Sequence, residues 1–167
     1  MSVAAEGAGA QRVAAVSGGA GAIGRAIVAA LAASGHRVVV IDLNAEISVD
    51  LTDEASTRGG AAELLDRYGR CDVLVHAAAA FDALSLADID AATWRRVQAA
   101  NVESPLWLAQ AFTPGMAQRG CGRIVFIASD TFWDPRLRRW CPTSPARSPW
   151  SGSCDLWRVR SARTASS

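Results

Sequence analysis

The stretch Ser17 to Gly24, S-G-G-A-G-A-I-G, decides the fold of this chain. It follows a short apolar run, Arg12 to Ser17 (RVAAVS), and opens a segment whose apolar residues recur at helical spacing. That segment stops at Ser34-Gly35, a pair typical of helix ends, and a β-branched run, Arg37 to Asp42 (RVVVID), comes next. The order strand, glycine-rich turn, helix, strand predicts a βαβ unit of about thirty residues.

The same alternation continues along the chain. Strands are predicted at Ile47 to Val49, Asp72 to Val75 and Arg123 to Ala128, and helices at Glu54 to Tyr68 and around Val102 to Arg119. In the last helix we expect a core stripe at Leu106, Ala109, Phe112 and Met116, because helices of this type pack on the sheet or pair with a second subunit. Pro114 predicts a kink or a change of helix axis. Strands that alternate with helices form parallel sheets covered on both faces. The predicted fold class is therefore α/β, with a doubly wound, mainly parallel sheet.

Composition and charge exclude several classes of protein. The 167 residues are 50% hydrophobic with a net charge of +1, which suits a soluble globular domain. We expect a cytoplasmic protein with no membrane partner, because the chain has no apolar run of roughly 18 residues and no signal-peptide pattern at Met1 to Ala10. The four cysteines form no C-x-x-C pair, so no metal site is expected.

The charge is divided between two parts of the chain, and no residue is lysine: all 17 basic residues are arginine. Residues 1–135 carry a net charge of −5, whereas Arg136 to Ser167 carries +6. The second part is rich in Arg, Ser, Pro and Trp and has no helical or strand periodicity. We therefore divide the chain into a dinucleotide-binding domain, residues 1–135, and a tail, residues 136–167, for which no fixed structure is expected.

The glycine-rich loop suits a phosphate ligand. Glycines permit a tight turn and close backbone approach, and the start of a helix offers unpaired N–H groups and partial positive charge to a pyrophosphate. Asp42 follows at the end of the second strand, where a carboxylate can accept hydrogen bonds from an adenosine ribose. The loop and the acid together predict nucleotide binding.

These residues resemble the short-chain dehydrogenase/reductase family of Rossmann-fold proteins, whose first loop reads T-G-x-x-x-G-x-G. Ser17 stands for the threonine, Gly18 and Gly24 match, and Ala22 replaces the middle glycine. Four more segments are similar, in the family's order: D-L-T-D (Asp50 to Asp53), D-V-L-V-H-A-A-A (Asp72 to Ala79), W-R-R-V-Q-A-A-N-V (Trp94 to Val102) and G-R-I-V-F-I-A-S (Gly122 to Ser129). The resemblance covers roughly residues 12–129.

The resemblance implies hydride transfer between NAD(P) and a small alcohol or ketone. Ser129 would hydrogen-bond the substrate oxygen, and Asn101 would hold a water. Cofactor contacts are implied for Ser17, Gly18, Ala22, Ile23, Gly24, Asp42, Leu43, Asp50, Leu51, His76, Ala77 and Ala78. We expect NAD rather than NADP, because Asp42 would repel a 2′-phosphate and no basic residue stands between Gly18 and Gly24.

Some positions depart from the family pattern. His76 and Ala77 replace two asparagines of the family. His76 either hydrogen-bonds near the cofactor or is a partly buried neutral imidazole with a backbone partner, and we favour the second interpretation. The methyl group of Ala22 is expected to weaken phosphate binding without abolishing it.

The family's tyrosine and lysine, Y-x-x-x-K, have no counterpart in this chain. The tyrosine is expected near position 142, which is proline, and the chain's single tyrosine is Tyr68. Arginine cannot replace the lysine, because its pKa above about 12 leaves it permanently charged. We therefore expect the chain to be catalytically inactive. The resemblance implies a homo-oligomer, but we do not expect this chain to form the family's full subunit interface.

A shifted reading frame would explain the tail. Trp140 to Arg147 can be encoded by TGG TGC CCT ACG TCG CCA GCA AGG. Preceded by an A that ends the Arg139 codon, the same bases read ATG GTG CCC TAC GTC GCC AGC AAG, which encodes M-V-P-Y-V-A-S-K. Two alternatives stay open: a non-catalytic nucleotide-binding or regulatory module, and a basic aromatic tail that binds nucleic acid.

Overall fold

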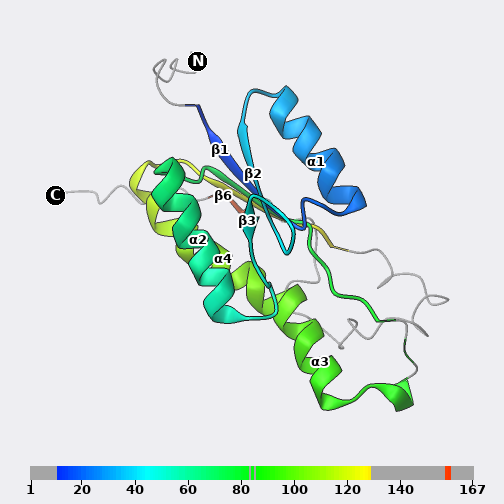
Figure 1. Ribbon diagram of the computed structural model, residues 1–167. Helices are drawn as coiled ribbons and strands as arrows, with labels where there is room; N and C mark the ends of the chain where they lie inside the picture. The colour runs from blue at the N-terminus through cyan, green and yellow to red at the C-terminus, as the bar shows by residue number, and fades with distance from the viewer. Residues whose placement is uncertain (1–10, 83, 85, 129–156, 159–167) are drawn as a thin grey trace.

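The computed structural model describes residues 11–82, 84, 86–128 and 157–158 (Figure 1). The elements, in chain order, are β1 (Val13–Ser17), α1 (Ala22–Ala33), β2 (Arg37–Asp42), β3 (Ile47–Ser48), α2 (Glu54–Tyr68), β4 (Val73–His76), the 3-10 helix η1 (Leu86–Asp88), α3 (Ala91–Gln98), the π-helical segment η2 (Ala99–Glu103), α4 (Ser104–Gln118), β5 (Arg123–Phe126) and β6 (Trp157–Arg158). The alternation of strands and helices confirms the predicted α/β class.

The sheet has the strand order β3-β2-β1-β4-β5-β6, and the strands from β3 to β5 are all parallel. Ser17 pairs with Ile41 on one side and with His76 on the other, and His76 pairs with Phe126. The carboxyl ends of β1, β2, β4 and β5 therefore lie along one edge of the sheet. In an open sheet of this kind, ligands bind at that edge.

Helix boundaries follow from local chemistry. α2 begins where the Asp53 side chain accepts a hydrogen bond from the Ser56 N–H, and it ends at Gly69, whose φ of 69° is left-handed. α1 ends at Ser34, and Gly35 follows with a φ of 86°. Both helices end where the sequence predicted, because the capping residues that define the ends are local signals.

The core lies between the sheet and the pair α2 and α4, which cover one face, while α1 covers the other (Figure 1). Phe112 and Met116 of the predicted stripe are buried, but Leu106 is 43% exposed, which corrects its assignment to the core. Pro114 lies inside α4, and the helix continues through it to Gln118.

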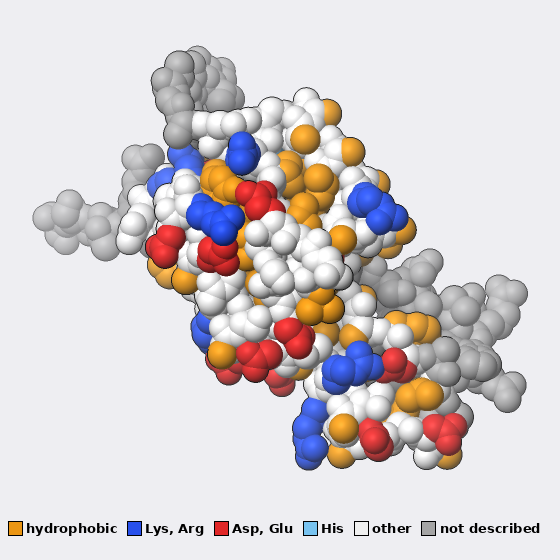
Figure 2. Space-filling view, in the orientation of Figure 1, with side chains coloured by type: hydrophobic (Ala, Val, Ile, Leu, Met, Phe, Trp, Pro, Cys, Tyr) orange, Lys and Arg blue, Asp and Glu red, His pale blue; other side chains and the backbone are white. Residues whose placement is uncertain are grey.

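Helix α1 covers its face of the sheet more loosely than α2 does. Gly24 is its one buried residue, and Ile23 is 61% exposed. Figure 2 shows apolar side chains gathered on the outer surface over α1. Within the part of the chain that the structure describes, no helix has the length and hydropathy needed to cross a membrane.

A buried carboxylate connects the amino ends of the strands. Asp72 accepts a hydrogen bond from the Val13 N–H (2.9 Å) and two from Arg70 (2.7 Å each), and Arg119 lies 3.4 Å away. Burial alone would raise the pKa of Asp72, but the hydrogen bonds and the two guanidinium charges outweigh burial and hold the pKa below its usual range. This cluster stabilises the sheet at the edge opposite the candidate site.

Two parts of the chain differ from expectation. The predicted helix around residues 102–119 is preceded by α3 and by the π-helical segment η2, which hydrophobic spacing did not reveal. In the tail, expected to lack fixed structure, β6 pairs antiparallel with β5 at Arg123 and Ile124. The other tail residues lie outside the described residues.

Candidate functional site

The loops that follow β1 and β4 touch at Gly18. Its φ of 71° is left-handed, and a Cβ there would come within 2.4 Å of the Ala78 backbone nitrogen. The Gly18 N–H donates to the Ile41 carbonyl (3.0 Å), and the Ala77 N–H donates to the Ser17 carbonyl (2.9 Å). Only glycine fits this position, so the backbone of the first loop lies against the fourth strand's loop.

The start of α1 is open to a ligand. Its N-cap residue, Gly21, has no side chain to accept hydrogen bonds from the first turn, and that turn contains no acid. A Cβ at Gly24 would come within 2.1 Å of the Gly18 carbonyl oxygen, so glycine allows the helix to begin directly against the turn. Ala22 and Ile23 are exposed beside it. The free N–H groups and the helix dipole form a site suited to an anion.

Asp42 lies beside this glycine loop, as its position in the sequence predicts. Its Oδ2 accepts a hydrogen bond from the Ala20 N–H (3.2 Å), and its Oδ1 accepts one from the N–H of Leu43 (2.8 Å), a residue that is 60% exposed. The Arg25 guanidinium donates to the carbonyl of the same Ala20. The carboxylate thus stands at the rim of the anion site.

Asp50 and Leu51 lie on the neighbouring loop, between β3 and α2. The Asp50 carboxylate accepts hydrogen bonds from the Thr52 hydroxyl (2.7 Å) and N–H (2.8 Å), and these bonds lower its pKa. Leu51 packs against the core. In this structure Asp50 therefore shapes its own turn.

His76 is buried under the junction of the loops. Its Nδ1 lies 2.6 Å from the Ser17 hydroxyl, and the ring of Phe126 meets it edge-on at 6.3 Å between ring centres. Burial, partly opposed by the Ala100 backbone, lowers its pKa to about 4. The pKa of about 4 corresponds to a neutral imidazole at pH 7, the interpretation we favoured, and the Ala100 backbone is the backbone group that acts on it. The ring is more deeply buried than expected, and its Nδ1 lies against a side-chain hydroxyl.

Asn101 joins helix and loop on the other side of the site. Its amide accepts a hydrogen bond from the Ala80 N–H (2.7 Å) and donates one to the Ala80 carbonyl (3.0 Å). It lies in η2, where the Ser104 N–H bonds to the Ala99 carbonyl, five residues back. Such π-helical turns are frequent at functional sites. Ser129, the other expected catalytic residue, lies outside the described residues.

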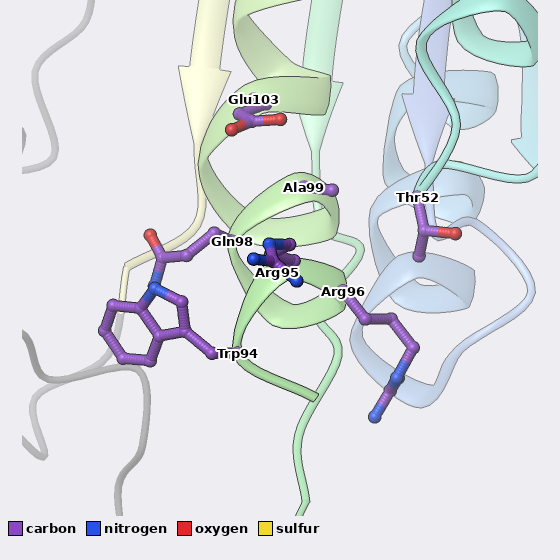
Figure 3. Close-up of a pocket in the computed structure, with 7 residues that line it drawn as sticks. All are labelled: Thr52, Trp94, Arg95, Arg96, Gln98, Ala99 and Glu103. Carbon is purple, nitrogen blue, oxygen red and sulfur yellow. The ribbon is translucent and has the colours of Figure 1, made fainter. Parts of the chain in front are cut away.

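The structure also has a hollow that sequence reasoning missed. It has a volume of about 520 Å³ and lies beside α3. Its lining residues are Thr52, Trp94, Arg95, Arg96, Gln98, Ala99 and Glu103 (Figure 3). Trp94 and Arg96 leave α3 in different directions, and Arg96 pairs with Asp82. None of the individually predicted site residues lines it, although Thr52 and the α3 residues belong to two of the segments that resemble the family. Among the described residues no group of acidic, His and Cys side chains could hold a metal ion.

The open helix start, the close glycine contacts and the rim carboxylate are features of the dinucleotide-binding class of α/β proteins. Residues 12–137 match the family model described as short chain dehydrogenase. The chain belongs to this family.

Two curated relatives and one solved structure illustrate the similarity. The chain is 36% identical over 134 residues to sorbitol dehydrogenase of Cereibacter sphaeroides, covering 71% of this chain and 52% of that protein. It is 34% identical to galactitol 2-dehydrogenase (L-tagatose-forming) of the same organism, covering 70% and 52%. A metagenomic short-chain oxidoreductase solved in complex with NADP superimposes with a TM-score of 0.68 at 29% identity, covering 74% and 65%. The chain spans about half the length of the curated relatives it matches.

Proposed function

We propose that this chain is the cofactor-binding part of an NAD(P)-dependent dehydrogenase that acts on a hydroxyl group of a small polyol. One observation carries the proposal: Gly18 and Gly24 let the first loop pack tightly against backbone that a Cβ would strike, so that α1 starts exposed beside Asp42. The named activities of the sorbitol and galactitol relatives support a polyol as the substrate class.

Each loop has a separate task in this proposal. The N–H groups at the start of α1 hold the pyrophosphate, and Asp42 accepts hydrogen bonds from the adenosine ribose. Asp50 and Leu51 lie beside the adenine, and the backbone at Ala77 and Ala78 supports the dinucleotide from the β4 side. When bound, the nicotinamide supplies or accepts the hydride.

The coenzyme preferred by this site is NAD. The Asp42 carboxylate attracts the hydrogen-bond donors of a ribose and repels the charge of a 2′-phosphate. The loop from Gly18 to Gly24 contains no basic side chain.

We further propose that the chain binds the dinucleotide without turning over an alcohol. Oxidation of a hydroxyl needs a group that accepts its proton, and the family's tyrosine and lysine are missing from the sequence. Tyr68 cannot stand in, because it bonds to Glu46 and stacks with Arg37, the first residue of β2, at the opposite edge of the sheet. The proposed roles of Asn101 and Ser129 therefore lack a proton carrier.

Titration calorimetry of the full chain with NAD tests this proposal, together with an assay for NADH formation from sorbitol and galactitol. Saturable binding of one NAD per chain and no NADH are expected. Undetectable NAD binding by chain that is shown to be folded would overturn the binding proposal. Steady NADH formation would overturn the proposed inactivity.

A further inference from the structure

Two side chains of opposite charge hold the backbone of Ala20, in the glycine loop. Its N–H donates to the Asp42 carboxylate (3.2 Å), and its carbonyl accepts a hydrogen bond from the Arg25 guanidinium. Because both contacts are made to one residue, both charged side chains lie on the rim of the site. Arg25 follows Gly24 directly, so it lies just outside the loop in which we sought a basic residue.

Arg25 occupies a helix position at which the helix dipole does not favour a positive charge. It lies in the first turns of α1, where the helix dipole presents partial positive charge, and the first turn contains no acid. Among the described residues no carboxylate forms an ion pair with Arg25; its side-chain hydrogen bond goes to the neutral Ala20 carbonyl. Its charge is therefore available to an anionic group on a ligand.

We propose that Arg25 is a specificity-determining residue for the coenzyme, an inference that rests on the proposed NAD(P) binding. The ribose 2′-position meets Asp42, and a phosphate there would be repelled by the carboxylate. Arg25 contacts the same backbone residue as Asp42, so its positive charge offsets part of that repulsion. Asp42 and Arg25 together set the ratio of the affinities for NAD and NADP.

The inference concerns a difference in affinity between two ligands. Arg25→Gln removes the charge but keeps a side chain that can donate to the Ala20 carbonyl. The variant should lower the affinity for NADP by about three- to tenfold and change that for NAD by less than about twofold. The difference should shrink as salt rises, because the charge acts through solvent.

Titrations of the full chain with NAD and with NADP, at low and moderate salt, test the inference. Arg67→Gln is the matched control: Arg67 is an exposed α2 residue paired with Glu63, near the helix end that leads to the amino edge of the sheet. It removes the same charge without approaching the loop. Asp42→Asn is expected to raise NADP affinity, and adding Arg25→Gln to it is expected to remove much of that gain.

The outcomes separate the two proposals. If the folded wild-type chain binds neither dinucleotide, the proposed function fails and this inference fails with it. If NAD binds but Arg25→Gln leaves the NAD to NADP ratio unchanged, alone and in the Asp42→Asn background, only the role of Arg25 is refuted. An equal loss for both coenzymes would show a merely structural role and would also refute it. Thermal melts of each variant establish that it is folded.

Discussion

The Ser17 hydroxyl and Nδ1 of His76 lie 2.6 Å apart, and both residues are buried. Ser17 ends β1, His76 ends β4, and the two are register partners in the sheet. The contact therefore ties together the two strands whose loops form the candidate site. Nε2 of the same ring has no hydrogen-bond partner among the described residues. With its proton on Nε2, a neutral ring accepts a hydrogen bond from the Ser17 hydroxyl at Nδ1, whereas a doubly protonated ring can only donate one.

The burial of His76 predicts that the folded chain loses stability in acid. In the folded chain burial lowers the pKa of His76 from 6.5 to about 4, so between these values the unfolded chain binds more protons. Stability from the neutral ring is fully present above pH 6.5 and is lost as pH falls toward 4, by up to about 3 kcal/mol. Urea unfolding from pH 7.5 to 5 should show a steeper loss for the wild type than for His76→Asn; equal slopes would contradict the prediction.

The hydroxyl of Ser17 is predicted to stabilise the same pair. Ser17→Ala leaves Nδ1 buried without a partner, which should cost about 1–3 kcal/mol in the free energy of unfolding at pH 7.5. Ser17→Thr keeps the hydroxyl and is the control, with a smaller expected loss. A Ser17→Ala variant as stable as the wild type would show that the contact contributes nothing.

Gly24 is predicted to tolerate no side chain. Gly24→Ala places a methyl 2.1 Å from the Gly18 carbonyl oxygen, so the helix must move away from the turn. We expect a loss of about 2 kcal/mol or more in stability, and weaker NAD binding, because overpacking against backbone is not easily relieved. Chemical denaturation and an NAD titration measure both effects.

Gly59 provides the matched control for that substitution. It lies in α2, and a Cβ there would meet no atom within 4 Å. Gly59→Ala should raise stability by about 0.5–1 kcal/mol, because alanine favours the helix over the unfolded chain. If both variants lose stability equally, the contact between Gly24 and the turn is not the cause.

Asp72 is predicted to stabilise the sheet at its amino edge. Asp72→Asn leaves Arg70 and Arg119 without their carboxylate, which should cost about 2–3 kcal/mol at neutral pH. Because the folded pKa of Asp72 is lowered, this contribution is present above the unfolded pKa near 4 and is lost in more acidic solution. Glu54→Gln, at an exposed pair with Arg58, is the control and should change stability by less than about 0.5 kcal/mol.

Local signals explain what the sequence predicts about the fold. The α2 bounds, Glu54 and Tyr68, follow from the Asp53 cap and the Gly69 stop, and β2 follows from a β-branched run. The segment η2 has no such signal, because a π turn depends on how α3 and α4 pack around Asn101. Leu106 shows the same limit: helical spacing gives a stripe, but tertiary packing decides which end of it is covered.

The sequence predicts which loops form the candidate site, but not the side-chain contacts between them. The glycine loop and Asp42 could be placed from strand ends alone. The pairing of Ser17 with His76 spans 59 residues, and the contact of Arg25 with Ala20 depends on the rotamer of an exposed side chain. Neither long-range register nor rotamer is encoded in a local pattern.

The frame-shift hypothesis makes a prediction about the gene. If residues from Trp140 onward are read out of frame, the Pro142 codon must end in T, which with the AC of Thr143 gives the tyrosine codon TAC. The Ala146 codon must end in A and Arg147 must use an AG codon, which together give a lysine codon. The Cys154 codon must be TGC, because TGT followed by the GA of Asp155 would create the stop codon TGA. Nucleotide sequencing tests these codons. A different codon at Pro142, Ala146 or Arg147 would remove the shifted Y-x-x-x-K motif, and TGT at Cys154 would end the shifted frame. Either result would refute the frame-shift hypothesis.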